Sequence, residues 1–234
     1  MRSDYGAAAE FYELVADRQA RVSGPVLTTA LSGLPTAAGP VVEIGAGTGR
    51  ITELIGAVLP AARILATEPC DPMRAVLTAR VLRGELGGRV TVRAEPAQTL
   101  ALPDRISAAV IFGVVNHLTP DERVELLRRL ARRLPPGAPI VVELMGGTRA
   151  RSIRRTRILR EPLGELVYEW WGSAEAVADR RLHWRTTWKV LRGDELVRVV
   201  REDYDWELVG LPELAAETGL RSRLLGPEIG VLTT

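Results

Sequence analysis

The chain has 234 residues, of which 46% are hydrophobic and 26% are charged, and its formal net charge is +2. This composition excludes a largely disordered protein, and the length suits one domain with a small appended subdomain. So small a charge excess predicts neither nucleic acid nor an anionic membrane as a partner. The single cysteine, Cys70, excludes an internal disulfide. We see no secretory signal and no membrane span, so we expect a cytoplasmic protein.

Residues 1–40 are predicted to form an N-terminal helical cap. Apolar residues three and four positions apart predict an amphipathic helix over about 8–22. The turn-forming run at 23–25 is predicted to interrupt it. A second helical stretch then leads into a loop rich in glycine and proline at 33–40.

Residues 41–148 alternate between short apolar strands and helices. Their repetition predicts a parallel sheet with helices on both faces. The predicted strands lie at 41–44, 64–67, 90–93, 108–112 and 140–144, and the predicted helices at 48–58, 72–83 and 120–134.

Residues 149–234 are predicted to form a lid with an antiparallel hairpin, followed by strands that complete the sheet. Alternation over 182–191 predicts one strand of the hairpin, and 195–201 is its predicted return strand. The arginines between 149 and 160 are interpreted as the solvated face of a helix. The alternative is a surface that receives an anionic substrate, carrier or peptide.

The strongest signal is the glycine-rich run from Val41 to Gly49, in which a predicted strand ends and a helix begins. Glycines allow a positive φ and the close approach of a ligand, and the start of a helix offers unpaired N–H groups. Glu68, at the end of the next predicted strand, could hold ribose hydroxyls. Arg50 stands where the last glycine of the dinucleotide fingerprint would lie, which disfavours a nicotinamide enzyme. A tight turn without a ligand is the other alternative.

This run, with Glu43 two residues before its first glycine, resembles motif I of the class I methyltransferases that depend on S-adenosylmethionine (SAM). Residues 64–73 and 90–95 are similar to that family's second and third motifs, and 134–143 to its turn and fifth strand. The resemblance covers about 11–144 well. It implies an α/β fold, Rossmann-like and doubly wound, with a mostly parallel seven-stranded sheet and a C-terminal antiparallel hairpin or lid insertion.

The resemblance also implies SAM as cofactor and S-adenosylhomocysteine (SAH) as product. In the family, one acid binds the ribose, an apolar residue packs on the adenine, and a second acid meets the adenine amine. Glu68, Met73 and Glu95 would take these roles, although Met73 could equally be a core residue. The implied cofactor-binding residues are Tyr12, Glu43, Gly45, Ala46, Gly47, Gly49, Glu68, Pro69, Met73, Ala94, Glu95, Phe112 and Gly113.

The methyl acceptor is expected beyond the carboxyl ends of the strands. His117 is the best candidate for a catalytic base because an unperturbed histidine titrates near neutrality. The alternative is a loop histidine that only packs. Hairpin packing is an equal alternative for two aromatic candidates, Tyr168 and Trp171. The candidate acceptor-contacting residues are Asn116, His117, Glu143, Tyr168 and Trp171.

The expected reaction is methyl transfer from SAM to a small-molecule or modified-peptide acceptor, by preference an amine in natural-product metabolism. The antiparallel strands after the fifth strand are similar to those of small-molecule N-methyltransferases. O- or C-methylation is the main alternative, followed by SAM binding without transfer and by RNA methylation. We expect no metal, since no set of aspartates and asparagines suggests one. We expect no nucleic-acid or membrane partner, and the exposed hairpin edge allows a homodimer.

Overall fold

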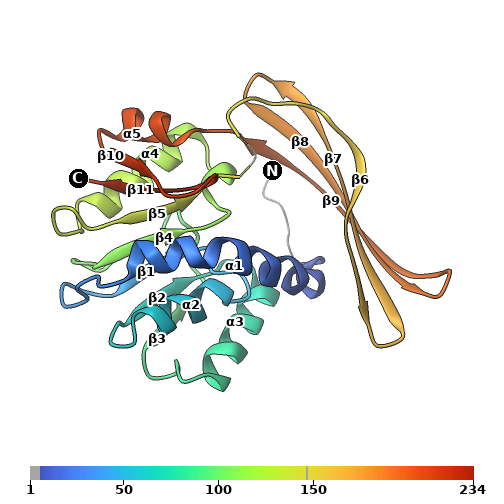
Figure 1. Ribbon diagram of the computed structural model, residues 1–234, viewed down its shortest axis with the longest axis horizontal. Coiled ribbons are helices and arrows are strands. Elements are labelled where there is room, and N and C mark those ends of the chain that lie inside the picture. The colour runs from blue at the N-terminus through green and yellow to red at the C-terminus, as the bar shows by residue number, and fades with distance from the viewer. Residues whose placement is uncertain (1–5, 146) are drawn as a thin grey trace.

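Two sheets organise the computed structural model, which describes residues 6–145 and 147–234. The larger sheet has seven strands in the order β10-β11-β5-β4-β1-β2-β3, and the smaller has four in the order β6-β7-β8-β9. The smaller sheet forms a separate curved layer beside the larger domain (Figure 1). The predicted α/β fold with a mostly parallel seven-stranded sheet is confirmed.

All strands of the seven-stranded sheet run in the same direction except β11. Strand β11 pairs antiparallel with both β5 and β10, whereas the other pairs run parallel. Every residue of β1, β2, β4 and β5 is buried, as expected when helices cover both faces of a sheet. The strands are β1 (Val41–Ile44), β2 (Ile64–Thr67), β3 (Val90–Arg93), β4 (Ala108–Ile111), β5 (Ile140–Glu143), β10 (Arg221–Leu224) and β11 (Ile229–Thr233).

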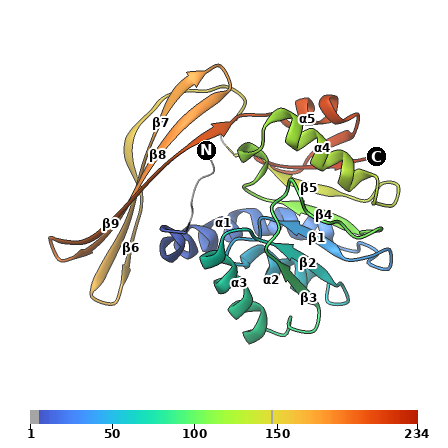
Figure 2. The same cartoon turned by 180° about the vertical axis from the view of Figure 1, so that it is seen from behind.

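Two hydrophobic clusters fix the helices to opposite faces of this sheet. One cluster contains side chains of α4 and α5, which lie side by side in Figure 2. The other contains side chains of α1, α2 and α3. None of the described helices is both long and apolar enough to span a membrane. The helices are α1 (Ala9–Leu31), α2 (Arg50–Val58), α3 (Asp71–Arg83), the short 3₁₀ helix η1 (Val115–His117), α4 (Pro120–Ala131) and α5 (Leu211–Thr218).

Helix α1 corrects one prediction, because it runs unbroken through Pro25. A proline inside a helix costs about 3 kcal/mol, so packing must compensate. A side chain at Gly24 would meet Leu54 of α2 at 3.2 Å, so the missing side chain lets the two helices approach closely. Beyond the proline, Leu27 and Leu31 are completely buried. Burial of the second half therefore holds the helix together where local propensity predicts a break.

The four-stranded sheet extends the predicted hairpin and corrects the interpretation of the basic run. Residues 149–160 were expected on a helix, but most of them belong to the exposed edge strand β6, which pairs with β7. Charged side chains on an edge strand discourage pairing with other chains, so arginines suit this position. The strands are β6 (Ile153–Leu163), β7 (Leu166–Ala178), β8 (Arg181–Arg192) and β9 (Glu195–Glu207).

The small sheet is attached to the larger domain at two places. Near the start of α1, Phe11 stacks on Trp188 of β8 with ring centroids 5.2 Å apart, and Trp170 of β7 stacks on the same indole at 5.0 Å. At the other place, Nε1 of Trp206 donates to the Met145 carbonyl at 3.1 Å, just after β5. These contacts place one face of the sheet, here called the inner face, toward α1 and η1.

Candidate functional site

The glycine-rich loop between β1 and α2 is held in a conformation that favours glycine. Gly45, Gly47 and Gly49 all have positive φ, at 70°, 56° and 89°. A side chain at Gly45 would lie 2.4 Å from Cγ2 of Val114. The loop is tied to β2, because the N–H of Ala46 donates to the Thr67 carbonyl at 2.8 Å. The loop therefore presents bare backbone at the carboxyl end of β1.

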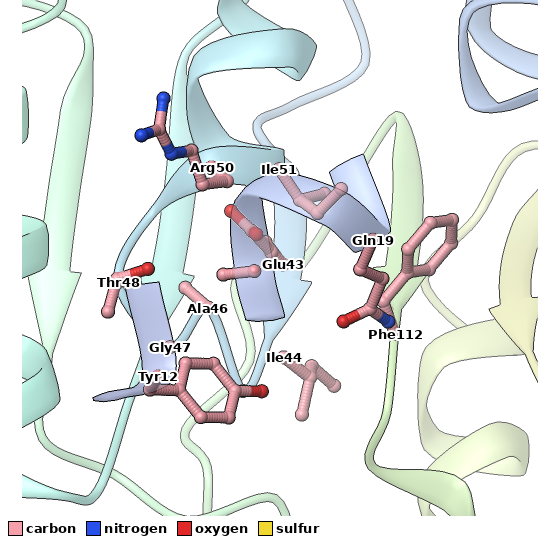
Figure 3. A pocket seen from close by; sticks show the side chains of 12 residues that line it. Tyr12, Gln19, Glu43, Ile44, Ala46, Gly47, Thr48, Arg50, Ile51 and Phe112 are labelled. Carbon is pink, nitrogen blue, oxygen red and sulfur yellow. The ribbon is translucent and has the colours of Figure 1, made fainter. Parts of the chain in front are cut away.

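A pocket lies over this loop, and α1 forms one of its walls (Figure 3). The structure brings six predicted cofactor residues together there: Tyr12, Glu43, Gly45, Ala46, Gly47 and Phe112. Sequence reasoning missed the remaining lining residues, which are Ala16, Gln19, Ile44, Thr48, Arg50 and Ile51. Ala16 and Gln19 follow the predicted residue Tyr12 at helical spacing, and this spacing would have been the signal for these two residues.

Glu68 lies immediately after β2 and is bonded to the glycine loop. Its carboxylate accepts the N–H of Gly47 and the N–H of Cys70, both at 2.8 Å. The residue is only 6% exposed. Burial raises the pKa of Glu68, while the two amides and Arg74 act in the opposite direction. A carboxylate held by two backbone amides has a fixed orientation and can accept further hydrogen bonds from a ligand's hydroxyls.

Glu43 supplies a second buried carboxyl group to the pocket. It is 3% exposed and accepts a hydrogen bond from Oγ1 of Thr52 at 2.6 Å. Burial raises the pKa of Glu43 to about 8, the Thr52 bond lowers it, and the nearby Glu68 raises it further. A positively charged ligand group beside Glu43 would favour its ionised form.

Glu143, predicted to contact the acceptor, lies at the end of β5 and faces α1. Oγ of Ser23 donates to its carboxylate at 2.6 Å, and Nε2 of Gln19 donates to the other oxygen. Burial raises the pKa of Glu143, and these two hydrogen bonds lower it. Both partners come from α1, so this carboxylate fixes the helix above the pocket.

An ionic cluster closes the outer side of the loop, and sequence reasoning missed it entirely. Nη2 of Arg80 lies 2.6 Å from Glu13, and Nη1 lies 2.8 Å from Glu53. Nε of Arg80 donates to the carbonyl of Thr48 within the loop at 2.8 Å. Arg50 also pairs with Glu13. The cluster joins α1, α2 and α3 around the glycine loop.

The remaining predicted cofactor residues do not line this pocket. Gly49 caps α2, and Gly113 follows β4 with a φ of 66°. Pro69 follows Glu68, and Met73 in α3 is buried. Ala94 and Glu95 follow β3.

The carboxylate of Glu95 is engaged in its own loop. It accepts the N–H of Ala101 at 2.7 Å and lies 3.4 Å from Nη1 of Arg93. Its expected contact with an adenine amine stays a prediction.

Asn116, another predicted acceptor contact, is 1% exposed and bridges the two sheets. Its Nδ2 donates to the Glu207 carbonyl at the end of β9, at 2.7 Å. Its Oδ1 lies 3.4 Å from the N–H of Met145. The side chain therefore holds the small sheet against the larger domain.

His117 lies on η1 with its ring against the inner face of the small sheet. The ring meets Trp206 edge-on at 4.5 Å and Tyr204 at 5.8 Å. Burial lowers the pKa of His117 to about 4. The imidazole is therefore neutral at pH 7, but it is a weaker base than an ordinary histidine.

Replacement of His117 by glutamine should make the protein relatively more stable in acid. The unfolded chain protonates histidine near pH 6.5, whereas the folded protein does so near pH 4. Stability contributed by the neutral ring is therefore present above about pH 6.5 and lost as the pH falls toward 4. Between pH 7 and pH 5 the unfolding free energy of the wild type should fall by about 2 kcal/mol more than that of the variant.

Urea unfolding of both proteins at the two pH values measures this difference. His183→Gln is the matched control. The ring of His183 lies 2.9 Å from the Asp205 carboxylate, so its replacement should not reproduce the acid effect expected for His117. Equal losses for wild type and His117→Gln would show that the ring is solvated.

The structure separates the two aromatic acceptor candidates. Tyr168 is on the inner face and meets Phe11 at 5.6 Å. Trp171 is on the outer face, where Nε1 donates to Glu169 at 2.7 Å and the Arg155 guanidinium lies 5.0 Å from the ring. Only Tyr168 therefore faces the larger domain.

Sequence reasoning missed Glu202 and Tyr204, which lie with Trp206 on the inner face of β9. It ended the return strand at 201, whereas β9 continues to Glu207. The alternation of these three residues with exposed Asp203 and Asp205 is a period-two signal that could have extended the strand.

The pocket fits a nucleoside-type ligand with a cationic amino-acid part. Oγ1 of Thr48 is buried in the loop and has no hydrogen-bond partner among the described residues. Glu43 offers a carboxyl group, and Glu68 offers oxygens that suit ribose hydroxyls. Across residues 6–145 and 147–234, no group of three histidine, cysteine or acidic side chains is placed to hold a metal ion.

Comparison with protein families matches residues 41–137 to a model described as a methyltransferase domain. The matched segment contains the glycine loop, Glu68, Phe112 and His117. Comparison with curated proteins gave no match.

Solved structures share the complete architecture. DesVI of Streptomyces venezuelae has a TM-score of 0.76 at 15% identity, over 100% of this chain and 99% of that one. SAM-bound CalS10 of Micromonospora echinaspora, an amino pentose methyltransferase involved in calicheamicin biosynthesis, gives 0.68 at 20% identity, over 98% and 91%. The sugar N-methyltransferase KedS8 of Streptoalloteichus gives 0.68 at 14% identity, over 98% and 87%. At these identities the likeness establishes the fold.

Proposed function

Since residues 41–137 match a methyltransferase domain, we propose that this chain is a class I SAM-dependent methyltransferase that methylates an amine of a small natural product or modified peptide. The observation that carries the proposal is the pocket over the glycine loop, next to Glu68, whose carboxylate two backbone amides hold.

The chain's own residues can bind and orient SAM. Glu68 would accept hydrogen bonds from the ribose, and bare backbone at Gly45 and Gly47 would allow a close approach. Glu43 would face the cationic amino-acid part, and the buried Thr48 hydroxyl would gain a partner. SAM, when bound, supplies a methyl group already activated by a positively charged sulfur. Alignment and exclusion of water are then the main tasks left to the protein.

The state of His117 favours nitrogen over oxygen as the acceptor atom. A hydroxyl needs a base to become a good nucleophile, whereas a neutral amine carries its own lone pair. A ring whose pKa is lowered to about 4 by burial is poorly suited to deprotonate a hydroxyl. Two structural neighbours described as an amino pentose methyltransferase and a sugar N-methyltransferase support the same choice.

Calorimetric titration with SAM, SAH and NAD tests the cofactor assignment. We expect SAM and SAH to bind with a roughly micromolar Kd and NAD not to bind. Glu68→Ala should weaken SAM binding by about tenfold or more, because a buried carboxylate that accepts from the ligand is removed. Glu85→Ala, at an exposed residue beyond the end of α3, is the matched control.

Mass spectrometry then tests the reaction, with SAM and matched amine and alcohol acceptors. Methylated amines support the proposal. Methylation of the alcohols alone, lost in His117→Ala and partly restored at high pH, would instead establish O-methylation. A folded protein that binds neither SAM nor SAH would contradict the cofactor assignment itself.

A further inference from the structure

The inner face of the small sheet carries a polar row between apolar and aromatic side chains. The row consists of Gly172, Thr186 and Glu202, which are direct partners across β7, β8 and β9. Its neighbours are Trp170, Trp188 and Val200 on one side and Ala174, Trp184 and Tyr204 on the other. Of the row's three residues, only Glu202 carries a charge.

Glu202 is on the part of β9 that faces η1, the short helix that follows β4. Glu202 and Tyr204 are two residues apart on the same face of β9, and the Tyr204 ring lies 5.8 Å from that of His117 on η1. Burial raises the pKa of Tyr204, and the charges of Glu202 and of Tyr12 raise it further. Tyr12 lines the pocket, and its ring lies 3.2 Å from where a side chain on Gly47 would begin. The carboxylate is therefore on the face of the small sheet that meets η1, and its charge acts on the same tyrosine as the pocket residue Tyr12.

We propose that Glu202 is the anionic anchor of the acceptor site, which receives the ammonium group of a cationic acceptor among Trp184, Tyr204 and His117. The inference rests on the proposed amine methylation and names the residue that selects the amine. The ring of His117 bounds this proposed site on the side of the larger domain. It lies 5.8 Å from the ring of Tyr204.

Charge and aromatic surroundings together explain why an amine would be preferred. A partly buried carboxylate attracts a cation more strongly than one in water, and aromatic faces add a cation–π attraction. A hydroxyl of the same shape gains neither term. Transfer of one ammonium proton to the Glu202 carboxylate leaves a neutral amine. Its lone pair can form the new C–N bond as the C–S bond breaks and the sulfur becomes uncharged.

Binding of two ring compounds of the same shape to the protein saturated with SAH tests the anchor. The probes are cyclohexylamine, which is an ammonium ion at pH 7, and cyclohexanol. The wild type should bind the amine about tenfold or more tightly, and Glu202→Gln should reduce this preference to about twofold or less. Asp203→Asn makes the same charge change one residue along, on the exposed outer face, and should keep the preference.

Equal binding of the two probes by the wild type would overturn the inference, as would an equal loss of preference in Asp203→Asn. Nuclear Overhauser contacts between cyclohexylamine and the rings of Tyr204 and Trp184 in the wild type supply a readout that does not depend on the variant's folding, and contacts elsewhere would also overturn it. If SAH binds but the preference for the amine is absent, the role of Glu202 is contradicted and the proposed function is not. If SAH does not bind, the proposed function is itself contradicted.

Discussion

Gly47→Ala should weaken SAM binding by about a hundredfold while the protein stays folded. Gly47 has a φ of 56°, a conformation that costs an L-residue about 1–2 kcal/mol. The new methyl group would lie 3.2 Å from Cε1 of Tyr12, so the ring or the loop must move. The N–H of Gly47 also orients Glu68. One methyl group therefore disturbs the glycine loop, the Tyr12 ring and the Glu68 carboxylate together. Titration with SAM measures the resulting loss of affinity.

Gly33→Ala is the matched control for this substitution. Gly33 has a similar positive φ of 73°, but nothing lies within 4 Å of the added methyl group. Both variants should therefore lose about 1–2 kcal/mol of unfolding free energy, and only Gly47→Ala should lose SAM affinity. Equal SAM binding by the two variants would show that the ligand does not approach this loop.

The seven-stranded domain could be predicted because its signals are local. Each parallel strand is a short apolar run bounded by turn residues, since both of its faces are covered. The glycine loop is contiguous, and Glu68 follows the next strand at a spacing that needs no knowledge of the fold. Four of the six residues at the pocket belong to this contiguous run, namely Glu43, Gly45, Ala46 and Gly47, whereas Tyr12 and Phe112 were implied by the family resemblance.

The parts that were missed depend on partners distant in the sequence. Pro25 predicts a break from local propensity, yet Gly24 and Leu27 pack so well that the helix continues. The arginines of β6 have no helical or strand pattern of their own, and pairing with β7 decides their structure. The ion pair between Arg80 and Glu13 joins residues of different helices.

The acceptor side was harder to predict for a further reason. A strand shows two faces, and the sequence does not say which one packs against the domain. For both Tyr168 and Trp171, packing was as good an interpretation as an acceptor contact, because no strand was predicted there, and the structure puts them on opposite faces of β7. Because the strand was ended at 201, Glu202 and Tyr204 were not considered.

Phe11→Ala should lower the free energy of unfolding by about 4 kcal/mol, the usual cost of removing a buried aromatic ring. Phe11 is completely buried, with its ring stacked on Trp188 at 5.2 Å and meeting Tyr168 at 5.6 Å. The residue links α1 to the small sheet, and Tyr12 beside it lines the pocket. We therefore also expect weaker SAM binding. Urea unfolding and SAM titration measure the two effects.

Val22→Ala on the same helix is the control, since Val22 is 72% exposed and its replacement should change stability by less than about 0.5 kcal/mol. Removing Phe11 and Trp188 together should cost about 1 kcal/mol less than the sum of the single losses, because the stacking term disappears only once. A loss below about 1 kcal/mol in Phe11→Ala would show that another contact docks the sheet. Since the proposed acceptor anchor is on that sheet, its position relative to the glycine loop depends on the stack between Phe11 and Trp188.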